Sequence, residues 1–167
     1  MPNLDEDLNA ILSRSHLIYS AEQIAQAIDS IAVQLNDRLK GTQPLLLCVM
    51  NGGLVFTGHL LTRLNCFPQV DYIHATRYRN ETSGSTLDWR AYPQKDLKGR
   101  TVLILDDILD EGITLKEIID YCNEQGAKEV VTSVLVKKLH DRCLAGLKSD
   151  YVGLEVEDKY VFGFGMD

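Results

Sequence analysis

The spacing of hydrophobic residues predicts an alternation of helices and strands. Ser20 followed by Gln23 is typical of a capping box, and apolar residues then recur at helical spacing until Lys40-Gly41 ends the run. This pattern predicts a long amphipathic helix that ends near residue 40. The same criteria predict a buried strand over 45–49, a helix over 54–64 and a strand over 69–76.

The second half of the chain continues the alternation. The apolar run 101–105 and the β-branched run 129–137 predict two further buried strands. Residues 114–125 have helical spacing and are followed by Gly126, which is typical of a helix end. Residues 151–167 are strand-like and rich in glycine and aromatic residues. Strands that alternate with helices indicate an α/β fold, with a Rossmann-like parallel sheet flanked by helices.

Residues 77–99 interrupt this pattern. The stretch that begins with Arg77 and Tyr78 is polar, contains glycine and has few side chains to bury. A loop of this length inside a compact domain is more often a lid or a binding loop than a passive connection. We therefore expect 77–99 to be a flexible functional loop.

Composition and charge narrow the function classes. The 167 residues are enough for one domain, and 45% hydrophobic with 25% charged residues is typical of a globular protein with a core. The net charge of −7 argues against non-specific binding to nucleic acid or to an anionic membrane surface. An anionic small substrate is compatible with this charge if main-chain amides or a metal ion supply the positive charge.

Cysteine usage and the N-terminal sequence bear on location. The four cysteines form no Cys-x-x-Cys pair and do not cluster with the four histidines, so the sequence indicates neither a zinc site nor a disulfide framework. The N-terminus is acidic, and no stretch reaches the roughly 18 apolar residues of a membrane span. We expect a cytoplasmic protein without a nucleic-acid or membrane partner.

The segment Val102–Thr114 contains the strongest chemical signal. Its apolar run ends in Asp106 and Asp107, and a short loop with Gly112 then leads into a helix. In a parallel α/β sheet the carboxyl ends of the strands face the ligand crevice. We therefore expect both aspartates at the mouth of a site.

The loop 110–114 is suited to binding a phosphate. Its main-chain N–H groups meet at a helix N-terminus, where unpaired amides and the helix dipole favour an anion. Gly112 permits the tight turn, and the Thr114 hydroxyl adds a donor. The alternative is that Asp110 or Thr114 only caps the helix and that the paired aspartates are solvated. Three acids with such a loop favour a site, although neither a Walker A sequence nor a Gly-x-Gly-x-x-Gly motif is present.

These residues resemble a known family. The span Val102–Thr114 resembles the phosphoribosyl pyrophosphate signature of the type I phosphoribosyltransferases, and an aspartate at position 110 is similar to the hypoxanthine-guanine branch. The resemblance extends to the family's pyrophosphate loop at Val49–Gly53, its flexible loop from Arg77-Tyr78 onward, and its purine-binding hood at Val136–Lys138 and Asp158–Gly163.

The resemblance implies a fold and an activity. The fold would be a single type I phosphoribosyltransferase domain over 1–167, with a small hood formed by the N-terminal segment and residues 151–167. The activity would be purine salvage, in which hypoxanthine or guanine and phosphoribosyl pyrophosphate give IMP or GMP and pyrophosphate, with Mg²⁺ as cofactor. Family members are usually dimers or tetramers, so we expect a homodimer or a homotetramer.

The resemblance also implies roles for the motif residues. Asp110 would be the general base toward purine N7. The implied substrate-binding residues are Asp106 and Asp107 for the ribose hydroxyls and Mg²⁺, Asp167 for Mg²⁺, Asp110, Glu111, Gly112, Ile113 and Thr114 for the 5′-phosphate, and Asn51, Gly52 and Gly53 for pyrophosphate. The pyrophosphate loop of the family also contains a non-proline cis peptide bond.

Purine recognition is implied for three further residues. Lys137 would donate to O6, Tyr160 would stack on the ring, and the Val161 main chain would meet the polar edge. An ammonium group has only donors, and the amine of adenine would leave it unpaired, which predicts 6-oxopurines as substrates. From the residues alone, a solvated lysine, a core aromatic and a tight turn are the simpler interpretations of Lys137, Tyr160 and Asn51-Gly52-Gly53.

Three departures from the family pattern bear on these roles. Glu111 stands where relatives generally have a small hydroxyl residue, and a carboxylate beside a phosphate is unfavourable unless it points away. Asn51 replaces the lysine of many relatives, which removes a positive contact to pyrophosphate. The chain stops at Asp167, before the family's tail with its pyrophosphate-binding arginine, so we expect an incompletely represented C-terminus.

Two other functions are compatible with parts of the sequence. A catalytically weak nucleotide-sensing regulator would keep the same fold, as relatives that bind RNA do. The net charge of −7 and the lack of a basic stripe count against RNA binding. A domain of the response-regulator type would also use paired acids to hold Mg²⁺, but it explains neither the loop 77–99 nor Lys137 and Tyr160.

Overall fold

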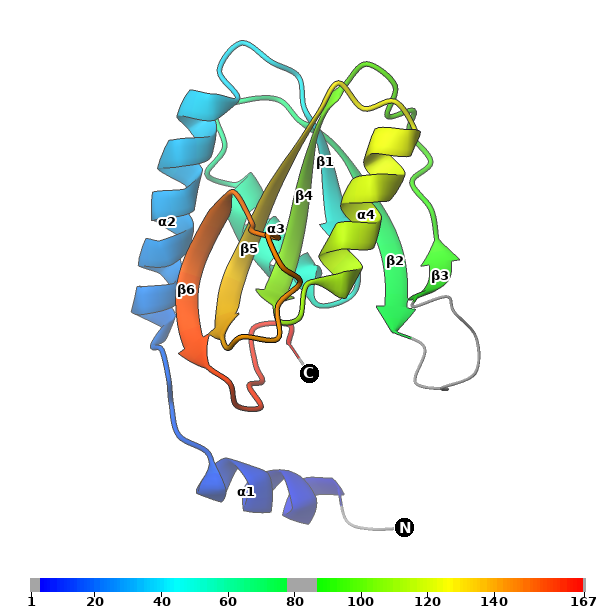
Figure 1. The fold of residues 1–167 in the computed structure, drawn as a ribbon. Helices are drawn as coiled ribbons and strands as arrows, with labels where there is room; N and C mark the ends of the chain where they lie inside the picture. The colour runs from blue at the N-terminus through cyan, green and yellow to red at the C-terminus, as the bar shows by residue number, and fades with distance from the viewer. Residues whose placement is uncertain (1–3, 78–86, 167) are drawn as a thin grey trace.

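A six-stranded sheet forms the centre of the molecule (Figure 1). The computed structural model describes residues 4–77 and 87–166. Its strands are β1 (Leu45–Val49), β2 (Gln69–Arg77), β3 (Leu87–Ala91), β4 (Thr101–Leu109), β5 (Glu129–Leu139) and β6 (Tyr151–Glu157), and its helices are α1 (Leu4–Arg14), α2 (Ala21–Arg38), α3 (Gly53–Leu61) and α4 (Ile113–Glu124). The strand order is β3-β2-β1-β4-β5-β6, and every neighbouring pair is parallel except β2 and β3. The predicted α/β fold is confirmed.

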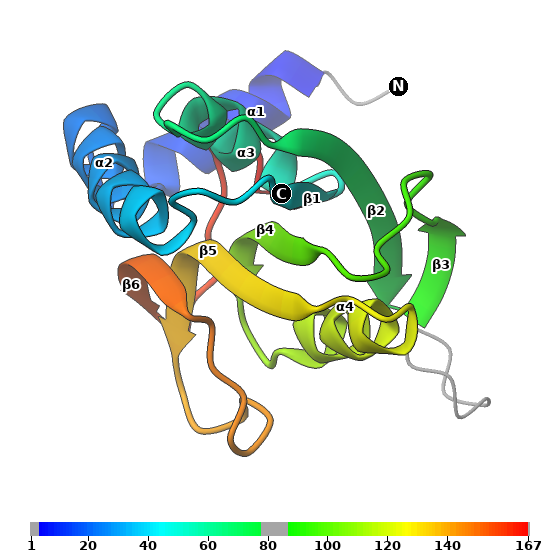
Figure 2. The same ribbon diagram turned by 90° about the horizontal axis from the view of Figure 1, so that it is seen from above.

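Two hydrophobic cores cover the two faces of the sheet. Helices α2 and α3 lie on one face and α4 on the other (Figure 2). Along β4, Leu103 and Leu105 belong to the core under α2 and α3, whereas Val102 and Ile104 belong to the core under α4. All four side chains are fully buried. Since side chains alternate along a strand, a strand covered on both faces is a continuous apolar run.

The predicted capping box begins α2. The Ser20 hydroxyl accepts a hydrogen bond from the Gln23 main-chain N–H at 3.3 Å, and the Gln23 side chain accepts one from the Ser20 N–H at 2.8 Å. These bonds satisfy two of the amides that a helix N-terminus leaves unpaired. The helix packs on the sheet through Ile28, Ile31 and Leu35.

β4 is longer than the apolar run predicts. It continues to Leu109, so Asp106 and Asp107 lie inside the last part of the strand and Asp110 follows its end. The extension is paired, because β5 stays in register with β4 as far as Lys137 opposite Leu109. The strands β1, β4, β5 and β6 run parallel, and their carboxyl ends meet at the lower edge of the sheet in Figure 1.

The prediction of a loop over 77–99 needs correction, because β3 lies within that stretch. Leu87 is buried, and the Trp89 ring stacks on that of Tyr92 with centroids 5.3 Å apart. The same indole contacts Tyr121 of α4 at a centroid distance of 5.5 Å. These aromatic contacts and the antiparallel pairing with β2 stabilise β3 at the edge of the sheet.

The segments predicted to form a hood lie in different parts of the fold. Helix α1 lies apart from the sheet in Figure 1. Among the described residues, no helix has the length and apolar character that crossing a membrane requires. β6 is a strand of the main sheet, parallel to β5. Residues 158–166 pass beneath the carboxyl edge, where a Cβ atom at Gly165 would lie 2.7 Å from the Gly52 carbonyl oxygen.

The aromatic contacts of β3 predict an effect on stability. Trp89→Ala removes the ring that packs against Tyr92 and Tyr121, so the free energy of unfolding should fall by about 2 kcal/mol. Phe67→Ala is the matched control, because Phe67 is 87% exposed and its loss should change the free energy by less than about 0.5 kcal/mol. Urea unfolding measures both, and equal effects would remove Trp89 from this role.

Candidate active site

The loop after β1 lies directly against β4 at the carboxyl edge. A Cβ atom at Gly52 would collide with the Asp107 carboxylate, and one at Gly53 would lie 2.8 Å from the Leu105 carbonyl oxygen. Glycine permits this close approach at both positions. The peptide bond that precedes Asn51 is cis, as the family resemblance implies, and Asn51 itself is exposed. The structure thus brings the predicted pyrophosphate loop together with Asp107.

Asp106 and Asp107 are adjacent carboxylates with different exposure. Asp106 is 8% exposed, whereas Asp107 is half-buried. The Asp106 carboxylate accepts the Asp107 main-chain N–H at 2.9 Å, and the Asp107 carboxylate accepts the Ile108 N–H at 2.8 Å. Burial, followed by the charge of Asp107, raises the pKa of Asp106 well above its ordinary range. Two negative charges at the end of β4 are therefore unfavourable unless a cation compensates them.

The turn into α4 presents main-chain amides. Gly112 adopts a left-handed conformation with φ of 83°, and no side chain caps the helix there. Within residues 4–77 and 87–166, the N–H groups of Gly112, Ile113 and Thr114 donate no hydrogen bond. This arrangement excludes the alternative in which Asp110 or Thr114 merely caps α4. Such amides, together with the helix dipole, favour a phosphate.

Glu111, which departs from the family pattern, forms an ion pair next to this turn. One of its carboxylate oxygens lies 3.8 Å from Nε of Arg142. Its carbonyl oxygen accepts the Leu144 main-chain N–H at 2.9 Å. The ion pair offsets part of the negative charge that Glu111 brings to the predicted phosphate loop.

Basic side chains surround Asp110 beyond the end of β4. Lys138 Nζ lies 2.9 Å from one carboxylate oxygen, and His140 Nε2 lies 2.7 Å from the other. Arg142 is more distant, at 3.9 Å. Burial alone would raise the pKa of Asp110, but hydrogen bonds from Lys138 and His140, together with the charge of Lys138, outweigh it and lower the pKa. Asp110 is therefore an ionised carboxylate at neutral pH, with both oxygens held.

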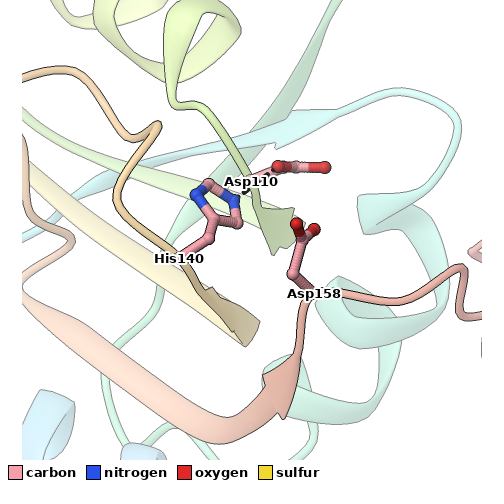
Figure 3. A group of neighbouring side chains, drawn as sticks. All are labelled: Asp110, His140 and Asp158. Carbon is pink, nitrogen blue, oxygen red and sulfur yellow. Dashed lines mark hydrogen bonds and ion pairs between the residues drawn. The ribbon is translucent and has the colours of Figure 1, made fainter.

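Asp110, His140 and Asp158 are close enough together to raise the question of a metal site (Figure 3). One donor atom of each lies within 4.8 Å of the others. Asp158, however, binds the Arg142 guanidinium through both oxygens, at 2.7 and 3.0 Å. Since Arg142 and Lys138 already compensate the two carboxylates, a bound ion would displace existing pairs. We therefore interpret this cluster as an ion-pair network.

The lysine beside Asp110 is Lys138, whereas the sequence analysis assigned the purine O6 contact to Lys137. Adjacent residues of a strand point to opposite faces of the sheet. Lys137 Nζ lies 3.6 Å from the Glu155 carboxylate of β6, and its side chain is 41% exposed, against 15% for Lys138. Two successive lysines contain no signal for which one faces the site, because that depends on the register of β5.

His140 and Arg142 had no role in the sequence prediction. Both follow β5 in a stretch that matches no motif quoted above. A signal for them was nevertheless present. The carboxyl ends of parallel strands meet at one edge of a sheet. Basic residues that follow the predicted strand 129–137 therefore lie near the aspartates that follow the predicted strand 101–105.

Tyr160 and Val161 lie in the segment after β6. Tyr160 is 77% exposed, and its ring centroid stands 6.3 Å from that of Phe162. This exposure excludes the interpretation of Tyr160 as a core aromatic. Val161 packs against the core under α2 and α3. The structure thus leaves an aromatic ring exposed in the segment beneath the carboxyl edge.

The remaining predicted residues fall at the limits of the described structure. Arg77 is the last residue of β2. Tyr78, predicted for the flexible loop, and Asp167, predicted to bind Mg²⁺, lie outside the described residues. Their roles stay predictions.

Comparison with known sequences shows which proteins this chain is similar to. Residues 16–167 match the family model described as phosphoribosyl transferase domain. The hypoxanthine-guanine phosphoribosyltransferase of Bacillus subtilis (strain 168) is 30% identical over 155 residues, which are 90% of this chain and 84% of that protein. The hypoxanthine-guanine-xanthine phosphoribosyltransferase of Tritrichomonas foetus is 26% identical over 151 residues, which are 90% of this chain and 82% of that protein.

Comparison with solved structures agrees. A crystal structure of a hypoxanthine-guanine phosphoribosyltransferase from Bacillus anthracis has a TM-score of 0.83 at 25% identity, over 92% of this chain and 88% of that one. A hypoxanthine phosphoribosyltransferase from Staphylococcus aureus, at 21% identity, shares the fold with a TM-score of 0.86 over 100% of this chain and 88% of the other. With its signature at the end of β4 and the family model matched over residues 16–167, the chain belongs to the phosphoribosyltransferase family, in its hypoxanthine-guanine branch.

Proposed function

We propose that this chain transfers the phosphoribosyl group of phosphoribosyl pyrophosphate to hypoxanthine or guanine, giving IMP or GMP and pyrophosphate. The names of the B. subtilis and T. foetus relatives support these bases. The observation that carries the proposal is the run of unpaired amides over 112–114, which follows the carboxylates of β4 and an ionised Asp110. A sugar phosphate bound there can place its 5′-phosphate on the amides and its ribose hydroxyls toward Asp106 and Asp107.

In this proposal Asp110 is the general base. As purine N9 bonds to C1 of the ribose and pyrophosphate leaves, the proton on purine N7 passes to the Asp110 carboxylate. Each of its oxygens accepts one hydrogen bond from a side chain, and a carboxylate accepts about four in all, so it can also accept the purine N–H. The negative charge also stabilises the oxocarbenium-like transition state.

The donor set at the end of β4 fits Mg²⁺. This ion prefers oxygen ligands and commonly uses one or two carboxylates where it binds substrate phosphates. Asp106 and Asp107 are adjacent carboxylates, and Asp107 lies against Gly52 of the predicted pyrophosphate loop. Bound to these aspartates, Mg²⁺ would supply the positive charge that the departing pyrophosphate needs. Asn51 and the two glycines of the loop would contribute main-chain amides.

We assign the contact with purine O6 to Lys138. O6 and N7 lie on the same edge of a 6-oxopurine, so a base whose N7 faces Asp110 has O6 near the ammonium group that binds Asp110. Because an ammonium group only donates, this contact favours 6-oxopurines over adenine. The exposed ring of Tyr160 would stack on the base, and the Val161 main chain would meet its polar edge.

The proposal extends to the cellular location and the oligomeric state of the enzyme. The four cysteines are free, which suits the cytoplasm. The exposed apolar side chains of Leu54, Val70 and Tyr72 line one cavity of about 470 Å³ between α3 and β2, which supports a homodimer or a homotetramer. A nucleotide-sensing regulator without turnover is not favoured, because the matched relatives are named as transferases.

The direct test supplies phosphoribosyl pyrophosphate and Mg²⁺ with hypoxanthine, guanine, xanthine or adenine in separate reactions. We expect nucleotide and pyrophosphate from hypoxanthine or guanine and none from adenine. Chelation of Mg²⁺ should stop turnover, because the charge of the leaving group is then uncompensated. Turnover of adenine but not of hypoxanthine would contradict the proposal.

Asp110→Asn tests the general base. The amide keeps the shape of the side chain but cannot take the N7 proton, so kcat should fall by roughly 10² or more while phosphoribosyl pyrophosphate still binds. Asp120→Asn is the matched control, since Asp120 pairs with Lys116 on the surface of α4. Steady-state kinetics and calorimetric binding give both readouts. An unchanged kcat in Asp110→Asn would remove Asp110 from this role.

The adjacent lysines provide a matched pair for base recognition. Lys138→Ala should lower kcat/KM for hypoxanthine by roughly 10- to 100-fold, the effect of losing a charged hydrogen bond in a partly buried site. Lys137→Ala should change it by less than about threefold, because Lys137 pairs with the exposed Glu155. Kinetics with hypoxanthine as the varied substrate decide between them. A larger effect at Lys137 would return the O6 contact to that residue.

A further inference from the structure

We propose that His140 is a positioning residue, which holds the Asp110 carboxylate in the orientation needed for proton transfer with the purine. The inference rests on the proposed function, in which Asp110 takes the N7 proton. His140 follows β5 directly and projects toward Asp110 at the carboxyl edge of the sheet (Figure 3). It lies outside the motifs that carry the family resemblance in this sequence.

The surroundings of His140 select one tautomer of its ring. Nδ1 accepts the Arg142 main-chain N–H at 3.1 Å. A ring nitrogen that accepts a hydrogen bond bears no proton, so the neutral imidazole has its proton on Nε2. Nε2 lies 2.7 Å from the nearest Asp110 oxygen and donates to it. The hydrogen bonds thus run in one direction, from the Arg142 amide to the imidazole and from the imidazole to the Asp110 carboxylate.

The imidazole is a rigid support for the carboxylate. Its side chain is 5% exposed, and both ring nitrogens are engaged. Lys138 holds the other oxygen at 2.9 Å, but through a flexible four-carbon chain. With a donor on each oxygen, the plane of the Asp110 carboxylate is defined. Proton transfer depends on this geometry, because it requires both hydrogen-bond distance and alignment.

The loop that contains His140 also holds the segment proposed to bind the purine. Arg142, whose amide orients the imidazole, binds both oxygens of Asp158 through its guanidinium group. A bidentate pair fixes orientation as well as distance. Asp158 begins the segment with Tyr160 and Val161. One short loop therefore contacts both Asp110, the proposed general base, and the segment proposed to hold the purine, which gives up the proton.

Loss of the imidazole should also change the pH dependence of turnover. The charged and titratable groups around Asp110 are Lys138, His140 and Arg142, with Asp158 and Glu111 bound to Arg142. Burial raises the pKa of Asp110 and the donors lower it, so removal of one donor raises the pKa. Because the ionised form accepts the proton, the acidic limb of the kcat profile should move to higher pH.

The test compares His140→Leu with His140→Gln. Leucine fills a similar volume without a donor, whereas the glutamine amide can still donate to Asp110. We expect kcat for hypoxanthine to fall by about 10-fold to 100-fold in His140→Leu, with an unchanged KM for phosphoribosyl pyrophosphate and a shifted acidic limb. His140→Gln should recover most of the loss. His16→Leu is the control, because His16 is exposed in the linker before α2 and its loss should leave kcat unchanged.

A second measurement does not depend on turnover. Nitrogen-15 NMR of the His140 ring should show the Nε2–H tautomer alone. The ring signals are assigned by their loss in His140→Gln, and they should change in Asp110→Asn. Equal losses of kcat in the leucine and glutamine variants, or a mixture of tautomers, would overturn the inference. If the parent protein converts hypoxanthine and His140→Leu keeps its kcat and pH profile, the inference fails while the proposed function stands. Absence of turnover in the parent protein would overturn the proposed function and, with it, this role of His140.

Discussion

The burial of β4 on both faces is the constraint on which the site depends. Two cores fully enclose the side chains of Val102, Leu103, Ile104 and Leu105. Burial of each such side chain stabilises the folded state by about 1.5–3 kcal/mol relative to leaving it exposed. This burial holds the strand at the centre of the sheet and leaves its carboxyl end as the part that reaches the surface. The acids of the signature follow directly, so the position of the site is a consequence of core packing.

At that edge, the environments of Asp106 and Asp110 shift the pKa of these two carboxyl groups in opposite directions. Asp106 is enclosed next to Asp107, and burial raises its pKa. Asp110 is bound by Lys138 and His140, which lower its pKa. The first environment suits a shared cation, whereas the second suits an acceptor that stays ionised until a proton is delivered. A chain with a net charge of −7 can bind an anionic substrate in this way, because amides and a few basic side chains supply positive charge locally.

Local sequence patterns predicted the elements that local interactions form. The capping box at Ser20 and Gln23 begins α2 as expected, and the apolar runs are strands covered on both faces. The patterns failed for β3, because its stability comes from pairing with β2 and from the contact of Trp89 with Tyr121 of α4. They also ended β4 too early, since pairing with β5 continues through polar residues as far as Leu109.

By itself, the sequence determined the α/β order of the chain, the acids after the second buried strand and the glycine-containing turn into the next helix. These features follow from side-chain spacing and from backbone freedom, which neighbouring residues dictate. Only the tertiary structure decided that Lys138 rather than Lys137 meets Asp110, and that His140 donates to it. Those contacts depend on the register of β5 against β4 and on an amide across a loop, and neither is encoded in the spacing of residues along one strand.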